Sequence, residues 1–195
     1  MMCYIKRKEG EIMLERKNYF HNKQIDLEGK IVNGQGRGRV STMRYGLFPM
    51  SYNGCEMIAL YNMLLLKGYK DANLPEICLE MYPKAWALWG IFGSNVYVLD
   101  HYFKPRGIPC TKTLSRDKFF ETLKKDRVGV ISFWNAHHPF DGIHTVCVEY
   151  TGDGYRVYNR YNSKRYPYEY KTVDEVVDKP RFMCGYTIPD FDPEK

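Results

Sequence analysis

The chain lacks any run of about 18 or more apolar residues, the length that a membrane-spanning helix requires. Its first 17 residues are rich in Lys, Arg and Glu, where a secretory signal peptide would carry an apolar stretch. These two absences remove the usual marks of a membrane or secreted protein. We therefore expect a soluble protein of the cytoplasm that does not act at a membrane.

The cysteines lack the spacings of a metal ribbon, a redox motif or a secreted disulfide framework. No two of them form a CxxC pair. They stand singly along the chain, as Cys3, Cys55, Cys78, Cys110, Cys147 and Cys184. A reduced, intracellular protein is the simplest interpretation.

A concentrated basic region is also missing. The formal net charge is +6 and there are 17 tyrosines, a combination that can indicate binding to single-stranded nucleic acid. The 29 basic residues, however, are interspersed with 23 acidic ones along the whole chain. The glycine-rich stretch 34–39 is too short for an arginine-glycine tail, and no GK[ST] follows it as in a phosphate loop. We expect no nucleic-acid partner.

Histidine is scarce, with five residues, and this limits the metal sites that the chain could form. His137 and His138 lie near His144 in sequence, but adjacent histidines on one loop rarely point the same way. No two cysteines have zinc-finger spacing. We therefore expect neither a metal nor another cofactor.

The length of 195 residues suits one domain. Residues 1–40 are polar and predict a loosely structured lead-in or a covering arm, so the domain proper is expected over 41–195. Helical patterns come first, over 57–66, 74–82, 94–103 and 115–125. Strand patterns follow, over 128–133, 144–150, 155–159, 166–171 and 182–188. Helices followed by an antiparallel sheet indicate an α+β fold.

Cys55 stands where a reactive cysteine would be placed. The stretch 52–55 is typical of a cap and turn, and an almost wholly apolar helical run begins at Met57 and ends before Gly68. Unpaired amides and the positive dipole end at a helix N-terminus stabilise a thiolate, which predicts a lowered pKa. The alternative is a buried, inert cysteine, since free cysteine is among the most buried residue types.

His144 is the best placed base for such a thiol. It opens a predicted strand after the sequence Asp-Gly-Ile, at the junction of a loop and a rigid sheet. A thiol nucleophile needs an imidazole to take its proton and to return one to the leaving group. The alternative is a strand histidine paired with a backbone carbonyl.

A third polar group must fix the tautomer of that imidazole. If Tyr150 pairs with Tyr155 across a four-residue turn, Asn159 shares a face with His144 at one diagonal step. A three-residue loop would shift the register by one and bring Asn162 opposite His144 instead. Asn159 is therefore the expected third member, and Asn162 is the alternative.

Taken together, these residues resemble a known family. The sequence Asn-Gly-Cys-Glu at 53–56 before a helix, Gly-Ile-His-Thr-Val at 142–146 and Tyr-Asn at 158–159 are similar to papain-like cysteine peptidases. The likeness is to the bacterial group that resembles bacteriocin-leader (double-glycine) peptidases, and it covers roughly 45–188. It implies a papain-like fold with Cys55 as nucleophile, His144 as base and Asn159 in the place usually held by Asp or Asn.

The chain departs from that family at one position. A glutamine that donates to the oxyanion usually stands a few residues before the cysteine, but the stretch 46–52 has none. Gln35 lies 20 residues upstream and could reach only if the chain folds back. We expect Asn53, together with the backbone N–H of Cys55, to substitute. Asn53 could equally be a simple N-cap.

The expected activity is hydrolysis of a peptide or other amide bond through an acyl-enzyme on Cys55. The partner would be the peptide or amide substrate, whose identity the sequence does not indicate, and the oligomeric state is not indicated either. The competing interpretation is a papain-like peptide-binding module with little or no turnover. The missing upstream glutamine, the mildly basic surface and the many tyrosines suit that alternative.

Overall fold

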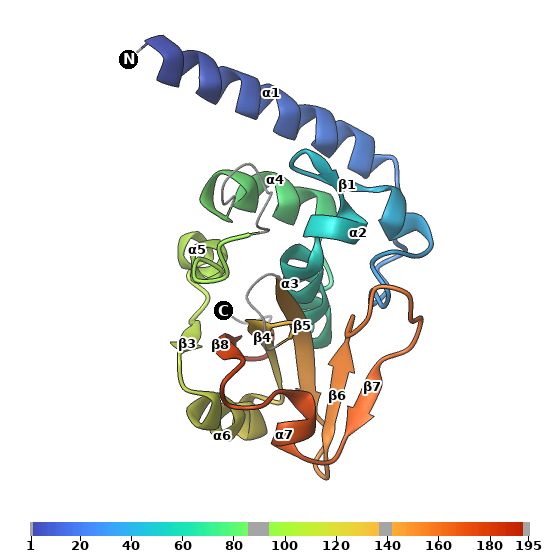
Figure 1. Cartoon of the computed structure of the whole chain (residues 1–195), viewed down its shortest axis with the longest axis vertical. Helices are drawn as coiled ribbons and strands as arrows, with labels where there is room; N and C mark the ends of the chain where they lie inside the picture. Colours follow the sequence, from blue (N-terminus) through green and yellow to red (C-terminus); the bar gives the residue numbers. More distant parts are fainter. Residues whose placement is uncertain (1, 86–93, 137–141, 193–195) are drawn as a thin grey trace.

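The computed structural model describes residues 2–85, 94–136 and 142–192, and Figure 1 shows the course of the chain. A helical part lies at one end of the molecule and a sheet at the other. The helical part contains α1 (Met2–Lys23), η1 (Arg39–Thr42), α2 (Met50–Asn53), α3 (Cys55–Leu66), α4 (Leu74–Ala85), α5 (Asp100–Phe103) and η3 (Lys104–Arg106). A small hairpin, β1 (Arg44–Tyr45) and β2 (Phe48–Pro49), precedes α2.

The main sheet has six strands in the order β3-β8-β4-β5-β6-β7, and every described pairing is antiparallel. Its strands are β3 (Thr111–Thr113), β4 (Val128–Trp134), β5 (Ile143–Tyr150), β6 (Tyr155–Tyr158), β7 (Tyr168–Tyr170) and β8 (Phe182–Thr187). Two further helices, α6 (Arg116–Asp126) and α7 (Val173–Val176), complete the domain. The predicted α+β organisation is thus confirmed.

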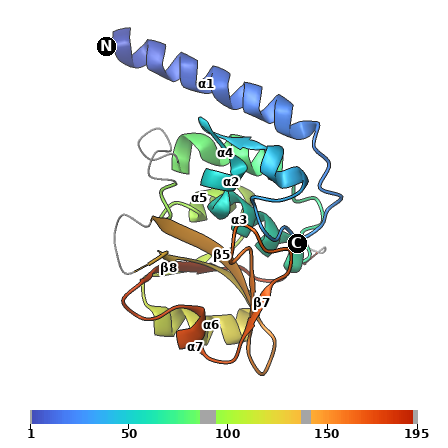
Figure 2. The same cartoon turned by 45° about the vertical axis from the view of Figure 1, so that its right-hand side comes forward.

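The sheet is covered on both faces, as Figure 2 shows, with α3 on one side and α6 on the other. Side chains alternate along β5 accordingly. Cys147 packs in the core that contains α3, whereas Val146 and Val148 pack in the core that contains Phe119 and Leu123 of α6. Odd-numbered residues of β5 therefore face α3, and even-numbered residues face α6.

Helix α3 is the centre of the larger core. Nine of its residues are buried, which explains why its sequence is apolar on most of its circumference. It ends as expected before Gly68, whose φ of +90° lies in the left-handed region. Gly54 precedes it, and a Cβ at Gly54 would meet the backbone carbonyl oxygen of Met50 at 2.6 Å. Only glycine therefore allows α2 and α3 to follow one another so closely.

The hairpin between β5 and β6 has the predicted register. Tyr150 pairs with Tyr155, and the N–H of Thr151 donates to the carbonyl of Gly154 across the turn. Cys147 pairs with Tyr158, the last residue of β6. The four-residue turn is confirmed, and Asn159 follows directly after the strand.

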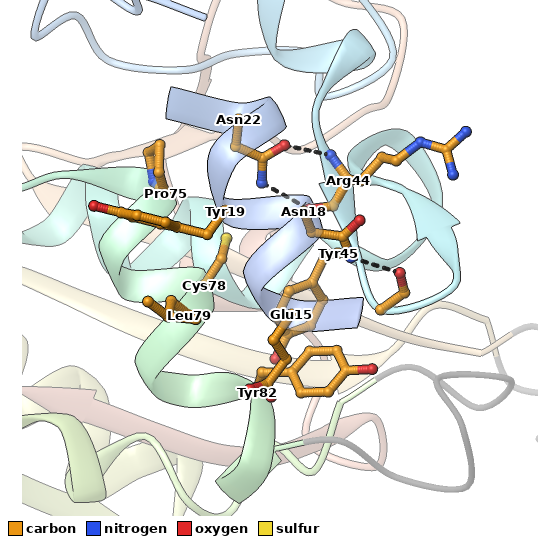
Figure 3. Close-up of a pocket in the computed structure, with 11 residues that line it drawn as sticks. Glu15, Asn18, Tyr19, Asn22, Arg44, Tyr45, Pro75, Cys78, Leu79 and Tyr82 are labelled. Atoms are coloured by element: carbon orange, nitrogen blue, oxygen red, sulfur yellow. Dashed lines mark hydrogen bonds between the residues drawn. The ribbon is translucent and has the colours of Figure 1, made fainter. Parts of the chain in front are cut away.

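The N-terminal segment differs from the prediction. Residues 2–23 form a long helix rather than a loosely structured lead-in, because they contain many Glu, Lys, Arg and Met, which are strong helix formers. Figure 3 shows how its second half is fixed: the Asn18 side chain donates to the carbonyl of Gly46 at 2.8 Å, and the Asn22 side chain exchanges two hydrogen bonds with the backbone of Arg44. The small pocket in that view, between α1 and α4, shares no lining residue with the one beside Cys55.

A second difference lies in the predicted helix over 94–103. The helix α5 begins only at Asp100, and the Asn95 side chain accepts a hydrogen bond from the N–H of Tyr97 in a turn. The prediction for 94–99 was wrong because Asn95 competes for the backbone in a local turn. Within the described residues, no helix is both long and apolar enough to cross a membrane.

Candidate active site

Cys55 is the first residue of α3 and is partly exposed. The backbone N–H groups of Thr145 and Glu56 and the hydroxyl of Thr145 lie close enough to its sulfur to favour the thiolate. One of these donors comes from the helix N-terminus and the others come from β5. The thiol therefore lies at the contact between α3 and the sheet.

Burial nevertheless dominates the acidity of this thiol. Desolvation raises the pKa of Cys55 to about 11, and the negative charge of Glu56 contributes in the same direction against the N–H groups of Thr145 and Glu56. The prediction of a lowered pKa is wrong for this arrangement. At pH 7 a thiol with a pKa of about 11 is ionised in only about one molecule in 10,000.

The sulfur lies at an open edge of β5. The N–H of Tyr150 donates to the carbonyl of Arg127, so even-numbered residues of β5 direct their N–H groups toward β4. The N–H of Thr145 therefore points to the opposite edge, beyond the point where β6 ends at Tyr158. Cys55 occupies this unpaired part of the strand edge.

His144 reaches the same edge from the other face of the sheet. Its ring makes an edge-to-face contact with Phe133, with 5.9 Å between ring centroids, and Phe133 belongs to the core on the α6 side. Its Nε2 lies 2.9 Å from the carbonyl oxygen of Asn159. Between Cys55 and His144, both of which the structure describes, there is no hydrogen bond. The structure thus brings the two residues to one strand edge without joining them.

The protonation of His144 follows from this geometry. A carbonyl oxygen only accepts hydrogen bonds, so Nε2 carries the proton and, in the neutral ring, Nδ1 is an acceptor. Burial lowers the pKa of His144 to about 4, and the charge of Arg160 acts in the same direction, against the backbone groups of Asn159 and Arg160. The imidazole is therefore neutral at pH 7 and able to accept a proton at Nδ1.

Asn159 orients the imidazole through its backbone rather than through its side chain, which corrects the predicted role of its amide. Its side chain instead pairs with Gln35: Oδ1 accepts from the N–H of Gln35 at 3.0 Å and Nδ2 donates to Oε1 at 2.8 Å. The N–H of Asn159 donates to the Asn33 side chain, and φ is +57°. These bonds fix a left-handed turn that directs the Asn159 carbonyl at His144.

Gln35 lies inside this network because the chain does fold back. Its Nε2 donates to the carbonyl of Ser51 in α2, at 3.0 Å, and the residue is buried. The sequence held a signal for this position in the two flanking glycines. A Cβ at Gly34 would meet a carbonyl oxygen at 2.3 Å, and one at Gly36 would meet the Asn162 side chain at 2.8 Å. The glycine-rich stretch serves close packing.

The other two candidate amides differ in position. Asn53 ends α2, is buried and lines a pocket with Cys55, and its Nδ2 has no hydrogen-bond acceptor within the described part of the chain. It is not an N-cap, because Gly54 occupies that position. Asn162 lies in the loop after β6, where its carbonyl accepts from the N–H of Gly36.

The pocket beside Cys55 is small, with a volume of about 30 Å³. Its lining residues are Tyr52, Asn53, Cys55, Glu56, Ser94, Val96, Ile143 and Thr145. His144 is not among them, in agreement with its position on the other face of β5. The pocket thus combines a thiol, an amide donor, a carboxyl group and hydroxyl groups.

No group of three or more His, Cys, Asp or Glu within 2–85, 94–136 and 142–192 is arranged to hold a metal ion. His137 and His138 lie outside those ranges. A comparison with protein-family models finds no match, and a search of curated proteins finds no significant relative.

Proposed function

We propose that this protein is a cysteine-dependent hydrolase with a papain-like fold, of the bacterial group similar to bacteriocin-leader peptidases. Cys55 forms an acyl-enzyme with a peptide or other amide, and His144 is the base. The observation that carries the proposal is the shared strand edge. The Cys55 sulfur contacts the backbone of Thr145, and the preceding residue holds a neutral imidazole that is oriented by Asn159.

In the first step the Cys55 thiol gives its proton to Nδ1 of His144, and the thiolate attacks the carbonyl carbon of the substrate. The oxyanion accepts hydrogen bonds from Nδ2 of Asn53 and the N–H of Cys55. The C–N bond then breaks, and His144 passes the proton to the leaving amine. Water, deprotonated by His144, hydrolyses the thioester and restores the thiol.

This cycle requires the imidazole to turn around the edge of β5 toward α3. In the resting arrangement its Nε2 bonds to Asn159 and its ring contacts Phe133, so the proton transfer follows a change of side-chain rotamer. Both groups are neutral at rest, with a pKa of about 11 for Cys55 and about 4 for His144. Substrate binding would favour the rotamer in which His144 faces Cys55, here called the closed form. In this form the thiolate of Cys55 and the imidazolium of His144 develop as an ion pair.

A second candidate function is a peptide-binding module with little or no turnover. The raised pKa of Cys55 and the separation of Cys55 from His144 favour it. In either case we place the protein in the cytoplasm. The five cysteines for which bonding is described, Cys55, Cys78, Cys110, Cys147 and Cys184, are all free, which suits a reducing compartment.

Labelling with a peptidyl vinyl sulfone tests the hydrolase directly. Mass spectrometry should detect modification of Cys55 in the wild type and little in His144→Ala, because the base sustains the thiolate. Asn159→Ala should lower turnover less than His144→Ala, because it loosens the imidazole without removing it. Equal labelling of wild type and His144→Ala would show that His144 is not the base. A complete lack of labelling with every peptide in a panel favours the binding module.

A further inference from the structure

Glu56 is the most unusual polar residue in the pocket beside Cys55. Its exposure is 1%, and neither carboxyl oxygen has a hydrogen-bond partner among the residues that the structure describes. A buried carboxyl group without a partner is costly, and natural proteins retain few of them. The residue nonetheless stands next to the proposed nucleophile, where its side chain lines the pocket.

The surroundings of Glu56 offer it no cation within the described ranges. Its negative charge raises the pKa values of Tyr45, Cys55, Cys184 and Tyr186, which are all acids themselves. Its own pKa is raised to about 8 by burial, and the nearby Ser94 hydroxyl opposes the shift only in part. Among the described residues, the Ser94 hydroxyl itself has no hydrogen-bond partner of normal geometry.

A role as a helix-terminus charge does not explain this position. An acidic residue in the first turn does interact favourably with the helix dipole, by about 0.3–1 kcal/mol when exposed. A buried carboxyl group without a partner loses more than that by desolvation. A glutamine, or an exposed glutamate, would satisfy the helix at lower cost.

We propose that Glu56 is a specificity-determining residue, which receives the ammonium or guanidinium group of a basic substrate side chain in the pocket beside Cys55. The inference rests on the proposed function and names its substrate class. The pocket is small, with a volume of about 30 Å³, so it suits the end of one side chain rather than a large ligand. Val96 and Ile143 supply apolar walls for the alkyl stem, and the Ser94 hydroxyl is a second acceptor for the cation.

Binding of a cation must expel the proton of Glu56, because only the carboxylate pairs with it. Below pH 8 the affinity should therefore increase about tenfold per pH unit, and it should level off above pH 8. The described groups that face Glu56 do not interfere, because Cys55 titrates at about 11, Cys184 at about 12, and Tyr45 and Tyr186 well above their usual range.

Binding to the full chain with Cys55→Ala tests the inference without requiring turnover. Calorimetry at pH 8 compares N-acetyl-lysine methylamide with its uncharged norleucine analogue, in variants with Glu56 and with Glu56→Gln. We expect the lysine compound to bind at least tenfold more tightly than the norleucine compound, and Glu56→Gln to abolish that difference. Titrations in two buffers at pH 7 should show release of nearly one proton. Thermal unfolding confirms that Glu56→Gln is folded, and Ser94→Ala gives a second variant with a smaller expected loss.

The outcomes separate the inference from the proposed function. Equal binding of the two compounds, a difference that survives Glu56→Gln, or no binding of the lysine compound overturns the inference. An amidase assay on wild type, with lysyl and norleucyl substrates, then tests the hydrolase. Binding that depends on Glu56 without any turnover supports the inference and contradicts the hydrolase proposal. Turnover that does not favour lysyl substrates supports the hydrolase proposal and contradicts the inference.

Discussion

The resting state of Cys55 makes a quantitative prediction for alkylation by iodoacetamide. Only the thiolate reacts, and a pKa of about 11 gives a thiolate fraction of about 10⁻⁴ at pH 7 and about 10⁻² at pH 9. The alkylation rate should therefore increase tenfold per pH unit from pH 6 to pH 10. Cys110, with a pKa of about 12, should have a tenfold smaller thiolate fraction at each pH.

The assay measures the rate at each pH by quenching samples and mapping modified peptides by mass spectrometry, which separates the individual cysteines. His144→Ala is the matched control. Because no hydrogen bond joins Cys55 and His144 at rest, the logarithm of the rate in this variant should still increase by one per pH unit. The small reagent reports the resting state, whereas a peptidyl electrophile reports the state with substrate bound.

Two results would refute this reasoning. A fast rate that stays constant between pH 6 and pH 8 would mean that the thiolate already exists, held by an imidazolium, so that Cys55 and His144 are paired at rest. The loss of that plateau in His144→Ala would identify the partner. A Cys55 that reacts more slowly than Cys110 would instead mean that its sulfur is inaccessible, which contradicts its partial exposure.

Three further predictions concern stability, measured by urea unfolding. Gln35→Ala should cost about 1–3 kcal/mol, because it removes the side-chain bond to Asn159 and leaves a buried amide unpaired; an unchanged midpoint would contradict it. Between pH 5 and pH 8 the unfolding free energy of wild type should fall by several kcal/mol relative to that of Glu56→Gln, since the folded pKa of Glu56 exceeds the unfolded one, whereas the lowered pKa of His144 raises the unfolding free energy equally in both proteins. Asp190→Asn should destabilise the protein more than Lys67→Met. It leaves the buried Lys67 ammonium without the carboxylate 2.8 Å away, whereas Lys67→Met leaves a carboxylate that is 83% exposed. The reverse order would refute this argument.

The sequence predicted the parts of the fold that depend on local pattern. The apolar run after Cys55, the helical pattern over 115–125 and the alternation after His144 each correspond to an observed helix or strand. The register at Tyr150 was also predictable, because the turn length determines it. Helix α1 was not, since its residues carry helix propensity without a clear apolar stripe.

The site was predictable in its residues but not in its contacts. Parity along the strands placed Asn159 beside His144, yet it could not indicate that the Asn159 carbonyl would bind the imidazole and that its amide would bind Gln35. The second contact depends on a loop that lies 124 residues away in sequence. The pKa of Cys55 could likewise not be predicted from the sequence, because burial by the whole fold raises it more than the local helix terminus lowers it.

The separation of Cys55 from His144 does not by itself decide between hydrolase and binding module. Turning the imidazole toward Cys55 breaks one hydrogen bond to Asn159, worth about 0.5–1.5 kcal/mol, and one aromatic contact to Phe133, worth a similar amount. The total of about 1–3 kcal/mol corresponds to a factor of roughly 5 to 150, so the closed form would be populated at about 1 to 15 per cent. An enzyme tolerates such a population, particularly when substrate binding raises it. If substrate binding assembles the hydrolase, labelling of Cys55 by a peptidyl electrophile should therefore depend on His144. Labelling by a small reagent should not.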